Sequence, residues 1–193
     1  MKRRSVIASV AGALAGPAWL AGCDPGPAGL GAGRSTLTHW PALPVLDLAR
    51  QPTTLPATSR RARLINVWAL WCPPCRRELP GLQRLALSLA QPLGQSLAQS
   101  LALSPAPRGV ELCTLALADD SFAVREYLAQ HAPGLQSVLL SPGSPAARQL
   151  GLDVLPQTFV VAADGRVLVR WSGERDWDSP AAREALDRLV RSG

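Results

Sequence analysis

Short apolar runs alternate with amphipathic segments over the part of the chain beyond about residue 60. Residues 63–68 (Arg-Leu-Ile-Asn-Val-Trp) are mostly apolar and include β-branched members, which is typical of a strand buried on both faces of a sheet. Further strands are predicted at residues 109–117, 137–140 and 167–171.

Segments with helix start and stop signals separate these strands. A helix is predicted to begin near residue 73, to continue past Pro80 and to stop before Pro92. Ser121 is the expected cap of a second helix that ends at His131. Two further helices, each opened by a Ser-Pro pair, are predicted at residues 144–151 and 179–190. The alternation of strands and helices predicts an α/β sandwich.

The composition is that of one globular domain. A chain of 193 residues fits a single core, and 47% apolar with 18% charged residues excludes a fully disordered chain and a multi-span membrane protein. The formal charge of +6 suggests an anionic partner at first. Lys2, Arg3 and Arg4 supply half of that charge, however, and the other arginines are scattered among acids. No nucleic-acid partner is therefore expected.

Residues 1–22 predict a secretory signal peptide, because a basic start is followed by an apolar stretch and then by small residues. Gly12, Gly16 and Pro17 interrupt the apolar stretch, so a stable membrane span is not expected. The end of the segment, Leu20-Ala-Gly-Cys23, resembles a bacterial lipobox. That resemblance implies that the cysteine carries lipid and begins the mature protein.

Other interpretations of the leader stay open. They are an ordinary signal peptide with an incidental cysteine, an uncleaved anchor, and twin-arginine export suggested by Arg3 and Arg4. Asp24 resembles a signal for retention in the inner membrane. Residues 23–39 are rich in Gly and Pro and predict a flexible tether, and residues 40–193 are the predicted folded domain.

Two cysteines follow the first buried strand with the spacing of a redox pair. Cys72-Pro-Pro-Cys75 opens the predicted helix, where unpaired amide groups and the helix dipole stabilise a thiolate and lower its pKa. Cys72 is therefore the expected nucleophile, and Cys75 is placed to resolve a mixed disulfide. Pro73 and Pro74 suit a first helical turn, which needs no amide protons from them.

Three other uses of the cysteine pair are less consistent with the sequence. A zinc site lacks two further ligands, because Cys113, His39 and His131 form no second pair at zinc spacing. Heme attachment requires a histidine where Arg76 stands. A purely structural disulfide across so short a loop adds little stability. No metal site and no cofactor are predicted.

Residues 65–80 (Ile-Asn-Val-Trp-Ala-Leu-Trp-Cys-Pro-Pro-Cys-Arg-Arg-Glu-Leu-Pro) resemble the active-site segment of the TlpA-like family of bacterial, extracytoplasmic protein disulfide reductases. Residues 151–166 resemble the family's strand that follows a cis-proline and closes in an Asp-Gly hairpin. The resemblance implies a thioredoxin-like α/β fold with a central mixed β-sheet flanked by helices. It also implies a strand-helix insertion and an N-terminal hairpin at residues 42–48 and 52–55.

The resemblance further indicates where substrate binds. Leu155-Pro156 is the expected cis peptide beside the thiols, since proline alone makes that isomer accessible. A trans proline at the start of an ordinary strand is the alternative. The family pairs the exposed backbone at this point with its substrate. The substrate-binding surface is expected to contain Leu155 together with Trp71, Pro73 and Pro74.

Asn66 stands where thioredoxins carry a buried aspartate that accepts the proton of the resolving cysteine. The resemblance implies Glu78 as the substitute, because it lies three residues after Cys75 and so on the same helix face. Its carboxylate could hold or relay a proton during product release. The alternative is a surface glutamate that offsets the charge of Arg76 and Arg77.

Three features are expected to carry no chemistry. Residues 88–107 contain a small duplication and predict a helix extension or a surface loop. Cys113 falls within a predicted strand, so a buried inert thiol is expected, with a third redox cysteine as the alternative. Trp68 is expected to belong to the core.

The predicted function is that of a lipid-anchored thiol-disulfide oxidoreductase that reduces protein disulfides at the periplasmic face of the cytoplasmic membrane. The resemblance implies a membrane thiol transporter as electron donor, and apocytochrome c cysteines or other periplasmic proteins as substrates. A monomer is expected. An oxidant or isomerase of the same fold is the near alternative, because the direction depends on the reduction potential. Two other classes fit the sequence less well. A thiol peroxidase needs a Ser or Thr near its reactive cysteine, and Trp71-Cys72-Pro73 does not provide one. A copper chaperone needs Cys-x-x-x-Cys with a partnering histidine, whereas the two cysteines here are separated by two residues.

Overall fold

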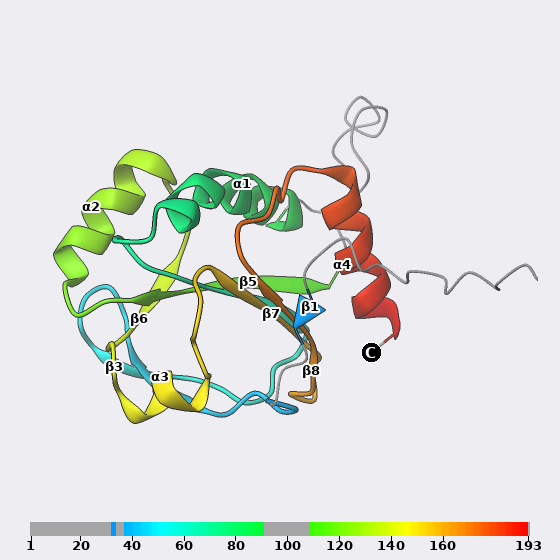
Figure 1. The fold of residues 1–193 in the computed structure, drawn as a ribbon, viewed down its shortest axis with the longest axis horizontal. Coiled ribbons are helices and arrows are strands. Elements are labelled where there is room, and N and C mark those ends of the chain that lie inside the picture. The colour runs from blue at the N-terminus through cyan, green and yellow to red at the C-terminus, as the bar shows by residue number, and fades with distance from the viewer. Residues whose placement is uncertain (1–31, 34–36, 91–108, 193) are drawn as a thin grey trace, which may run out of the picture.

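The computed structural model describes residues 32–33, 37–90 and 109–192, and Figure 1 shows them as one mixed sheet with helices on both faces. The sheet has eight strands in the order β1-β8-β7-β4-β5-β6-β2-β3. The strands are β1 (Ala32–Gly33), β2 (Leu43–Leu46), β3 (Pro52–Leu55), β4 (Ala62–Trp68), β5 (Val110–Leu117), β6 (Ser137–Leu140), β7 (Gln157–Val161) and β8 (Val167–Ser172). The predicted mixed sheet and the predicted N-terminal hairpin, β2 with β3, are confirmed.

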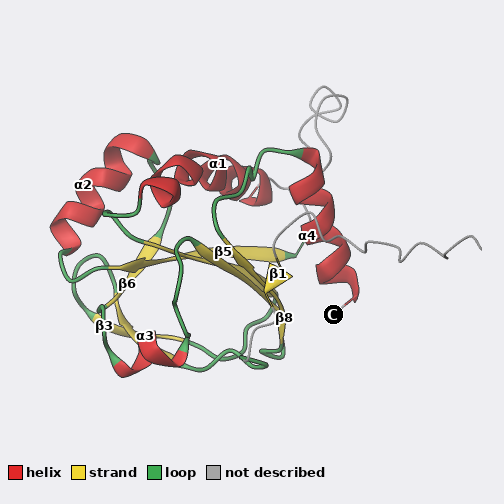
Figure 2. Ribbon diagram, in the orientation of Figure 1, coloured by secondary structure: helices red, strands yellow, loops and turns green. Residues whose placement is uncertain are grey.

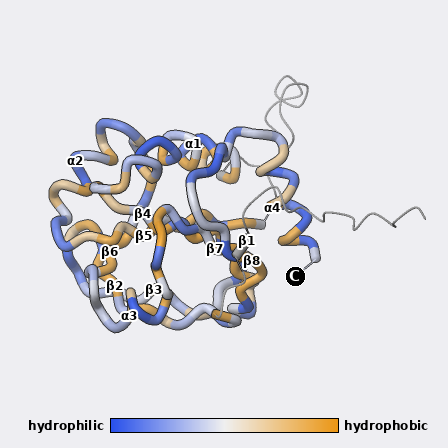
Figure 3. The backbone as a smooth tube through the Cα atoms, in the orientation of Figure 1, coloured by the Kyte–Doolittle hydropathy of each residue, from blue (hydrophilic) through white to orange (hydrophobic). Residues whose placement is uncertain are grey.

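The central strands set the direction of the sheet. β4 is parallel to β5, which is parallel to β6, whereas β7 runs antiparallel to both β4 and β8. β4 is buried along nearly its whole length, as its continuous apolar sequence predicts, and the hydrophobic parts of the backbone in Figure 3 coincide with these inner strands. The carboxyl ends of β4 and β5 and the amino end of β7 therefore lie at one edge of the sheet.

Four helices complete the described structure (Figure 2): α1 (Pro73–Ala90), α2 (Ser121–His131), α3 (Pro145–Gln149) and α4 (Pro180–Ser192). The core on one face of the sheet includes Leu82 of α1, Leu128 of α2 and Leu186 of α4. The other face is covered by α3 and the hairpin, with Trp40 packed edge-on against Phe159 at 5.2 Å between ring centroids. Helices thus flank the sheet as predicted.

Two structural details differ from the sequence-based expectations. The cap of α2 is Asp120 rather than Ser121, because the extended Asp120 places its carboxylate to accept hydrogen bonds from the amides of Phe122 and Ala123. In addition, Ala32 of the predicted tether pairs with Trp171 of β8, so part of that segment lies along the sheet.

Several predictions fall wholly or largely outside the described residues. They concern the signal peptide at residues 1–22, the lipidated Cys23 and most of the duplication at residues 88–107. Trp68, by contrast, is fully buried, so its assignment to the core is confirmed. Within the described ranges, no helix combines the length and the apolar character needed to cross a membrane.

A substitution in the Asp-Gly turn between β7 and β8 should change the stability of the protein measurably. Gly165 has φ +93°, and a Cβ added there would lie 2.9 Å from the carbonyl oxygen of Ala57. Gly165→Ala should therefore lower the free energy of unfolding by about 2–4 kcal/mol, from backbone strain and this clash together. Gly143→Ala is the matched control, because Gly143 has φ +72° and open space around it. Urea denaturation should show the larger loss for Gly165→Ala, and equal losses would contradict the clash.

Candidate active site

The site is built around a disulfide at the amino end of α1. Cys72 and Cys75 are joined with an S–S distance of 2.05 Å, and the amide of Cys75 donates a hydrogen bond to Sγ of Cys72 at 3.3 Å. Cys75 is fully buried, whereas Cys72 keeps 4% of its surface exposed. Of the two cysteines, only Cys72, the predicted nucleophile, keeps any exposed surface.

The local sequence explains this position. β4 ends at Trp68, and α1 begins at Pro73, directly after Cys72. The two prolines occupy the first helical turn, as predicted, where a missing amide proton costs nothing. In the same turn the amide of Cys75 is directed at Sγ of Cys72, so a thiolate there is stabilised once the disulfide is reduced.

The strand on the other side of β4 contributes the predicted proline. The Leu155–Pro156 peptide is cis, and Gln157 after it pairs with Val67 of β4. Pro156 therefore lies at the same sheet edge as the disulfide, and Leu155 packs against the cluster that contains both cysteines. The Pro156 carbonyl accepts a hydrogen bond from the amide of Gly173 at 2.8 Å, so this oxygen is already used within the protein.

The residues next to Cys72 and Cys75 in sequence include exposed side chains. Trp71, which directly precedes Cys72, is 69% exposed. Pro73 is exposed and Pro74 is half-buried. A bulky apolar side chain that remains in water next to a reactive sulfur is suited to contact a partner. The assignment of these residues and Leu155 to substrate binding stays a prediction.

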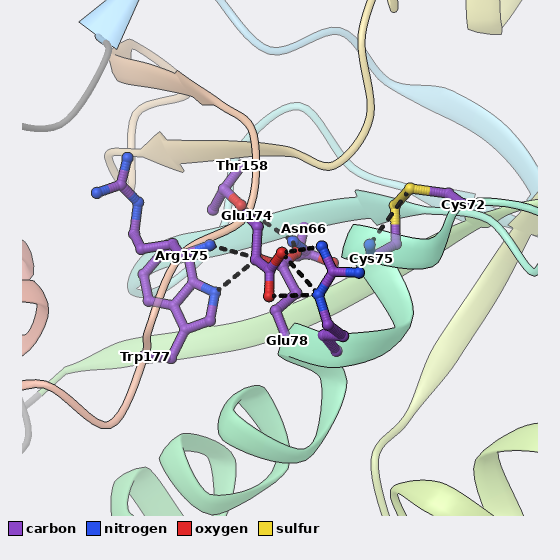
Figure 4. The surroundings of a disulfide bond; sticks show 9 residues. Asn66, Cys72, Cys75, Glu78, Thr158, Glu174, Arg175 and Trp177 are labelled. Atoms are coloured by element: carbon purple, nitrogen blue, oxygen red, sulfur yellow. Dashed lines mark hydrogen bonds and ion pairs between the residues drawn. A yellow bond between two sulfur atoms is a disulfide. The ribbon is translucent and has the colours of Figure 1, made fainter.

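Glu78 lies behind the disulfide, one helical turn beyond Cys75 (Figure 4), and only 3% of its surface is exposed. Its Oε1 accepts a hydrogen bond from Nδ2 of Asn66 at 2.7 Å. Its Oε2 accepts from the amide of Arg175 at 3.1 Å and from Nε1 of Trp177 at 3.4 Å. The alternative of an exposed, charge-balancing glutamate is therefore wrong.

The environment of Glu78 changes its acidity. Burial raises the pKa of its carboxyl to about 7, against the lowering effect of the three hydrogen-bond donors. A carboxyl with such a pKa can both hold and release a proton near neutral pH, which is what proton transfer to or from a thiol requires. The structure thus gives Glu78 the properties that the sequence could only suggest.

The replacement of an acid by Asn66 has a structural consequence. Nδ2 of Asn66 bridges Glu78 and Oγ1 of Thr158, the second at 3.0 Å. Its Oδ1 is buried without a hydrogen-bond partner among the described residues. Asn66 therefore binds the carboxylate of Glu78 through one end of its amide and keeps a free acceptor at the other end.

Sequence reasoning missed the segment that completes this site. Residues 173–178 lie between β8 and α4 and supply the contacts of Arg175 and Trp177 to Glu78. The available signal was a tryptophan within a polar, loop-like stretch, Gly173-Glu-Arg-Asp-Trp-Asp178. Such a residue is more often packed onto a neighbouring element than left in solvent.

Cys113 lies on β5, away from the helix that carries the pair, and is partly buried against the opposite face of the sheet. Burial raises the pKa of its thiol to about 11. At pH 8 only about one thousandth of it is thiolate, so it should react slowly. These properties fit the inert thiol predicted from the sequence.

Alkylation should separate the two kinds of cysteine. In reduced Cys23→Ser protein treated with iodoacetamide at pH 8, Cys72 should be modified first, and Cys113 should react only after addition of urea. Mass spectrometry of peptides gives both rates. Equal rates at Cys72 and Cys113 in the native protein would show that Cys113 is not protected.

A strand that leads into Cys-x-x-Cys at a helix start, with a cis-proline on the neighbouring antiparallel strand, defines a thioredoxin-fold dithiol-disulfide protein. Comparison with known proteins agrees with this geometry. The chain belongs to the Redoxin family, whose model matches residues 40–186.

Named relatives narrow the class further. The chain is 31% identical over 111 residues to a thiol:disulfide interchange protein DsbE homolog of Paracoccus denitrificans, covering 58% of this chain and 50% of that one. It is 25% identical over 136 residues to the thiol-disulfide oxidoreductase ResA of Bacillus thuringiensis, covering 70% and 68%. The chain thus spans half to two thirds of the length of these relatives. Their names match the class of thiol-disulfide oxidoreductases that the sequence predicts.

A solved structure gives the fold. A thiol:disulfide interchange protein of the thioredoxin family from Chlorobium tepidum superposes with a TM-score of 0.56 at 22% identity, covering 83% of this chain and 97% of that one. The predicted thioredoxin-like fold is therefore confirmed.

Proposed function

We propose that this protein is a reductase of protein disulfides, anchored by lipid on Cys23 at the outer face of the cytoplasmic membrane. The observation that carries the proposal is the Cys72–Cys75 pair at the amino end of α1, with a buried Glu78 behind it. Cys72, the more exposed of the two cysteines, is positioned to attack a partner. The carboxyl of Glu78 is positioned to accept and return a proton.

The reaction follows from this arrangement. In the reduced protein, the Cys72 thiolate attacks one sulfur of a substrate disulfide; that bond breaks, a mixed disulfide forms, and the first substrate thiolate leaves and takes a proton. Cys75 then loses its proton and attacks Sγ of Cys72, which releases the second substrate thiol. Two electrons pass to the substrate, and the protein is left with the Cys72–Cys75 disulfide seen here.

Glu78 serves the second step in this proposal. The thiol of the buried Cys75 needs a base, and Asn66 cannot act as one. A carboxyl whose pKa is about 7 is charged in a large fraction of molecules near neutral pH and can accept the proton. When a dithiol donor later reduces the disulfide, the same carboxyl can return the proton to Cys75.

The location and the partners are part of the proposal. A leader at residues 1–22 followed by Cys23 supports export and lipidation. The proposed substrates are disulfides of periplasmic proteins, including those of apocytochrome c. A membrane thiol transporter is the proposed electron donor. A relative named as a thiol:disulfide interchange protein supports the proposal that the partners are proteins with thiols or disulfides.

The reduction potential of the Cys72–Cys75 pair tests the direction. The purified protein should have a potential well below that of strong periplasmic oxidants and should reduce insulin disulfides when supplied with dithiothreitol. Tryptophan fluorescence in thiol redox buffers gives the potential. A value near −120 mV, which is on the order of that of the oxidant DsbA, would assign the protein to disulfide formation instead.

A further inference from the structure

Residues 173–178, here called the strap, are fastened to α1 from outside. Arg77 of α1 forms a salt bridge with Glu174 at 2.5 Å, and Arg84 of α1 forms another with Asp178. Asp178 also lies 3.6 Å from Arg183 of α4. Two turns of the helix that carries Cys75 and Glu78 are thereby joined to the strap.

The strap also reaches the buried carboxyl directly. Two of the three donors to Glu78 belong to it: the Arg175 amide and Nε1 of Trp177, both on Oε2 (Figure 4). Trp177 is only 1% exposed, and its ring lies 5.9 Å from that of Trp171. The strap therefore closes the side of Glu78 that faces away from β4.

We propose that the strap is a positioning element for Glu78, which fixes the carboxyl beside Cys75 and sets how readily it gives up its proton, with Trp177 as the contacting residue. This inference rests on the role proposed above for Glu78. It assigns a function in the thiol chemistry to Trp177 and to the Arg77–Glu174 salt bridge, although Nε1 of Trp177 bonds Glu78 and the salt bridge joins two side chains on the exposed surface.

The charged side chains of the strap affect the ionisation of Glu78. Glu174 disfavours ionisation of Glu78, and the guanidinium of Arg175 interacts favourably with the ionised form. β4 and β7 present the neutral Asn66 and Thr158. On α1, Arg77 offsets Glu174, and Cys75 faces the site as a thiol when reduced; on α4, Arg183 is engaged with Asp178.

The first test replaces the contacting residue. Trp177→Phe keeps an aromatic ring but removes a donor that stabilises the ionised carboxylate, so the pKa of Glu78 should rise by about 0.5–1. Carboxyl ¹³C NMR of the oxidised protein measures it, with the signal assigned by its absence in Glu78→Gln. Trp171→Phe is the control, since Trp171 packs on Trp177 without bonding Glu78. If the pKa of Glu78 did not change in Trp177→Phe, the indole donor would not set its acidity, and the proposal would be wrong. A lower pKa would also overturn it, because it would mean that water had entered and solvated the carboxylate.

The second test uses exposed residues, so that folding is not at risk. Glu174→Gln removes the negative charge and should lower the pKa of Glu78, whereas Arg77→Gln leaves that charge without its partner and should raise it. Both variants break the same salt bridge, so a merely structural strap would shift the pKa in the same direction in each. Shifts of equal sign would overturn the inference.

Insulin reduction by the same variants separates the two proposals. The pH at which turnover is half-maximal should follow the pKa of Glu78 across the series. If the wild type failed to reduce insulin while the NMR shifts appeared as expected, the proposed function would fall and control of Glu78 by the strap would stand. If turnover were normal and the NMR shifts were absent, the strap inference alone would fall.

Discussion

Replacement of Cys72 by serine should abolish disulfide reduction. The expected loss in turnover is about three orders of magnitude or more, down to the rate measured without protein, because no other group can replace the nucleophile. Cys75 is fully buried and cannot substitute for it. Insulin reduction with dithiothreitol, followed by turbidity, measures the loss.

Cys75→Ser should give a different outcome. Its Cys72 remains at the start of α1 and can attack, but the mixed disulfide has no resolving thiol. When the reduced variant is freed of dithiothreitol and mixed with substrate, mass spectrometry of a non-reducing sample should find about one equivalent of substrate linked to Cys72. A Cys72→Ser sample treated in the same way should carry no adduct.

Cys113→Ser is the matched control for both variants, since it removes a cysteine from the opposite face of the sheet. It should keep the activity of the wild type. Loss of activity in Cys113→Ser, or full turnover in Cys72→Ser or Cys75→Ser, would show that the assignment of the chemistry to Cys72 and Cys75 is wrong.

The redox pair could be predicted because its determinants are local. A buried strand, a Cys-x-x-Cys and two prolines follow one another within residues 63–75, and each constrains the next. The cap of α2 shows the limit of such reasoning. Asp120 and Ser121 are both good capping residues, and only the backbone geometry decided that Asp120 accepts the amide hydrogen bonds.

The environment of Glu78 could not be predicted, because it depends on contacts across the chain. Arg175 and Trp177 lie almost a hundred residues away in sequence, and the sequence pattern does not show that their segment packs on α1. The helix face of Glu78 was predictable from its spacing to Cys75. Its burial, and with it the raised pKa, required the position of the strap.

The buried carboxyl should make the stability of the protein depend on pH. Glu78 has a pKa of about 7 when folded, against an ordinary value of 4.5, so the folded state holds a proton that the unfolded state has lost between these values. The free energy of unfolding should therefore fall as the pH rises through this window. The total loss from this group is about 3 kcal/mol at pH 8 relative to pH 4.

Glu78→Gln should remove this dependence. The amide is neutral at every pH, and the free Oδ1 of Asn66 gives it a partner: if the Asn66 amide turns over, Oδ1 can accept from the new NH₂ group while the Gln oxygen faces the strap donors. Urea denaturation of the oxidised protein between pH 4 and pH 8 measures the difference. Below pH 4.5 the two proteins should have similar stabilities, and above pH 7 the variant should be the more stable by about 3 kcal/mol.

Glu184→Gln supplies the control for the pH series, because Glu184 is an exposed glutamate on α4 paired with Arg188. Its stability curve should run parallel to that of the wild type.

The activity of Glu78→Gln should change in the opposite sense to its stability, since an amide cannot accept the proton of Cys75. A variant that is more stable above pH 7 and slower to resolve the mixed disulfide would show that the same buried carboxyl destabilises the fold and serves the reaction. Parallel pH curves for Glu78→Gln and the wild type would instead mean that the pKa of Glu78 is the same in the folded and the unfolded protein.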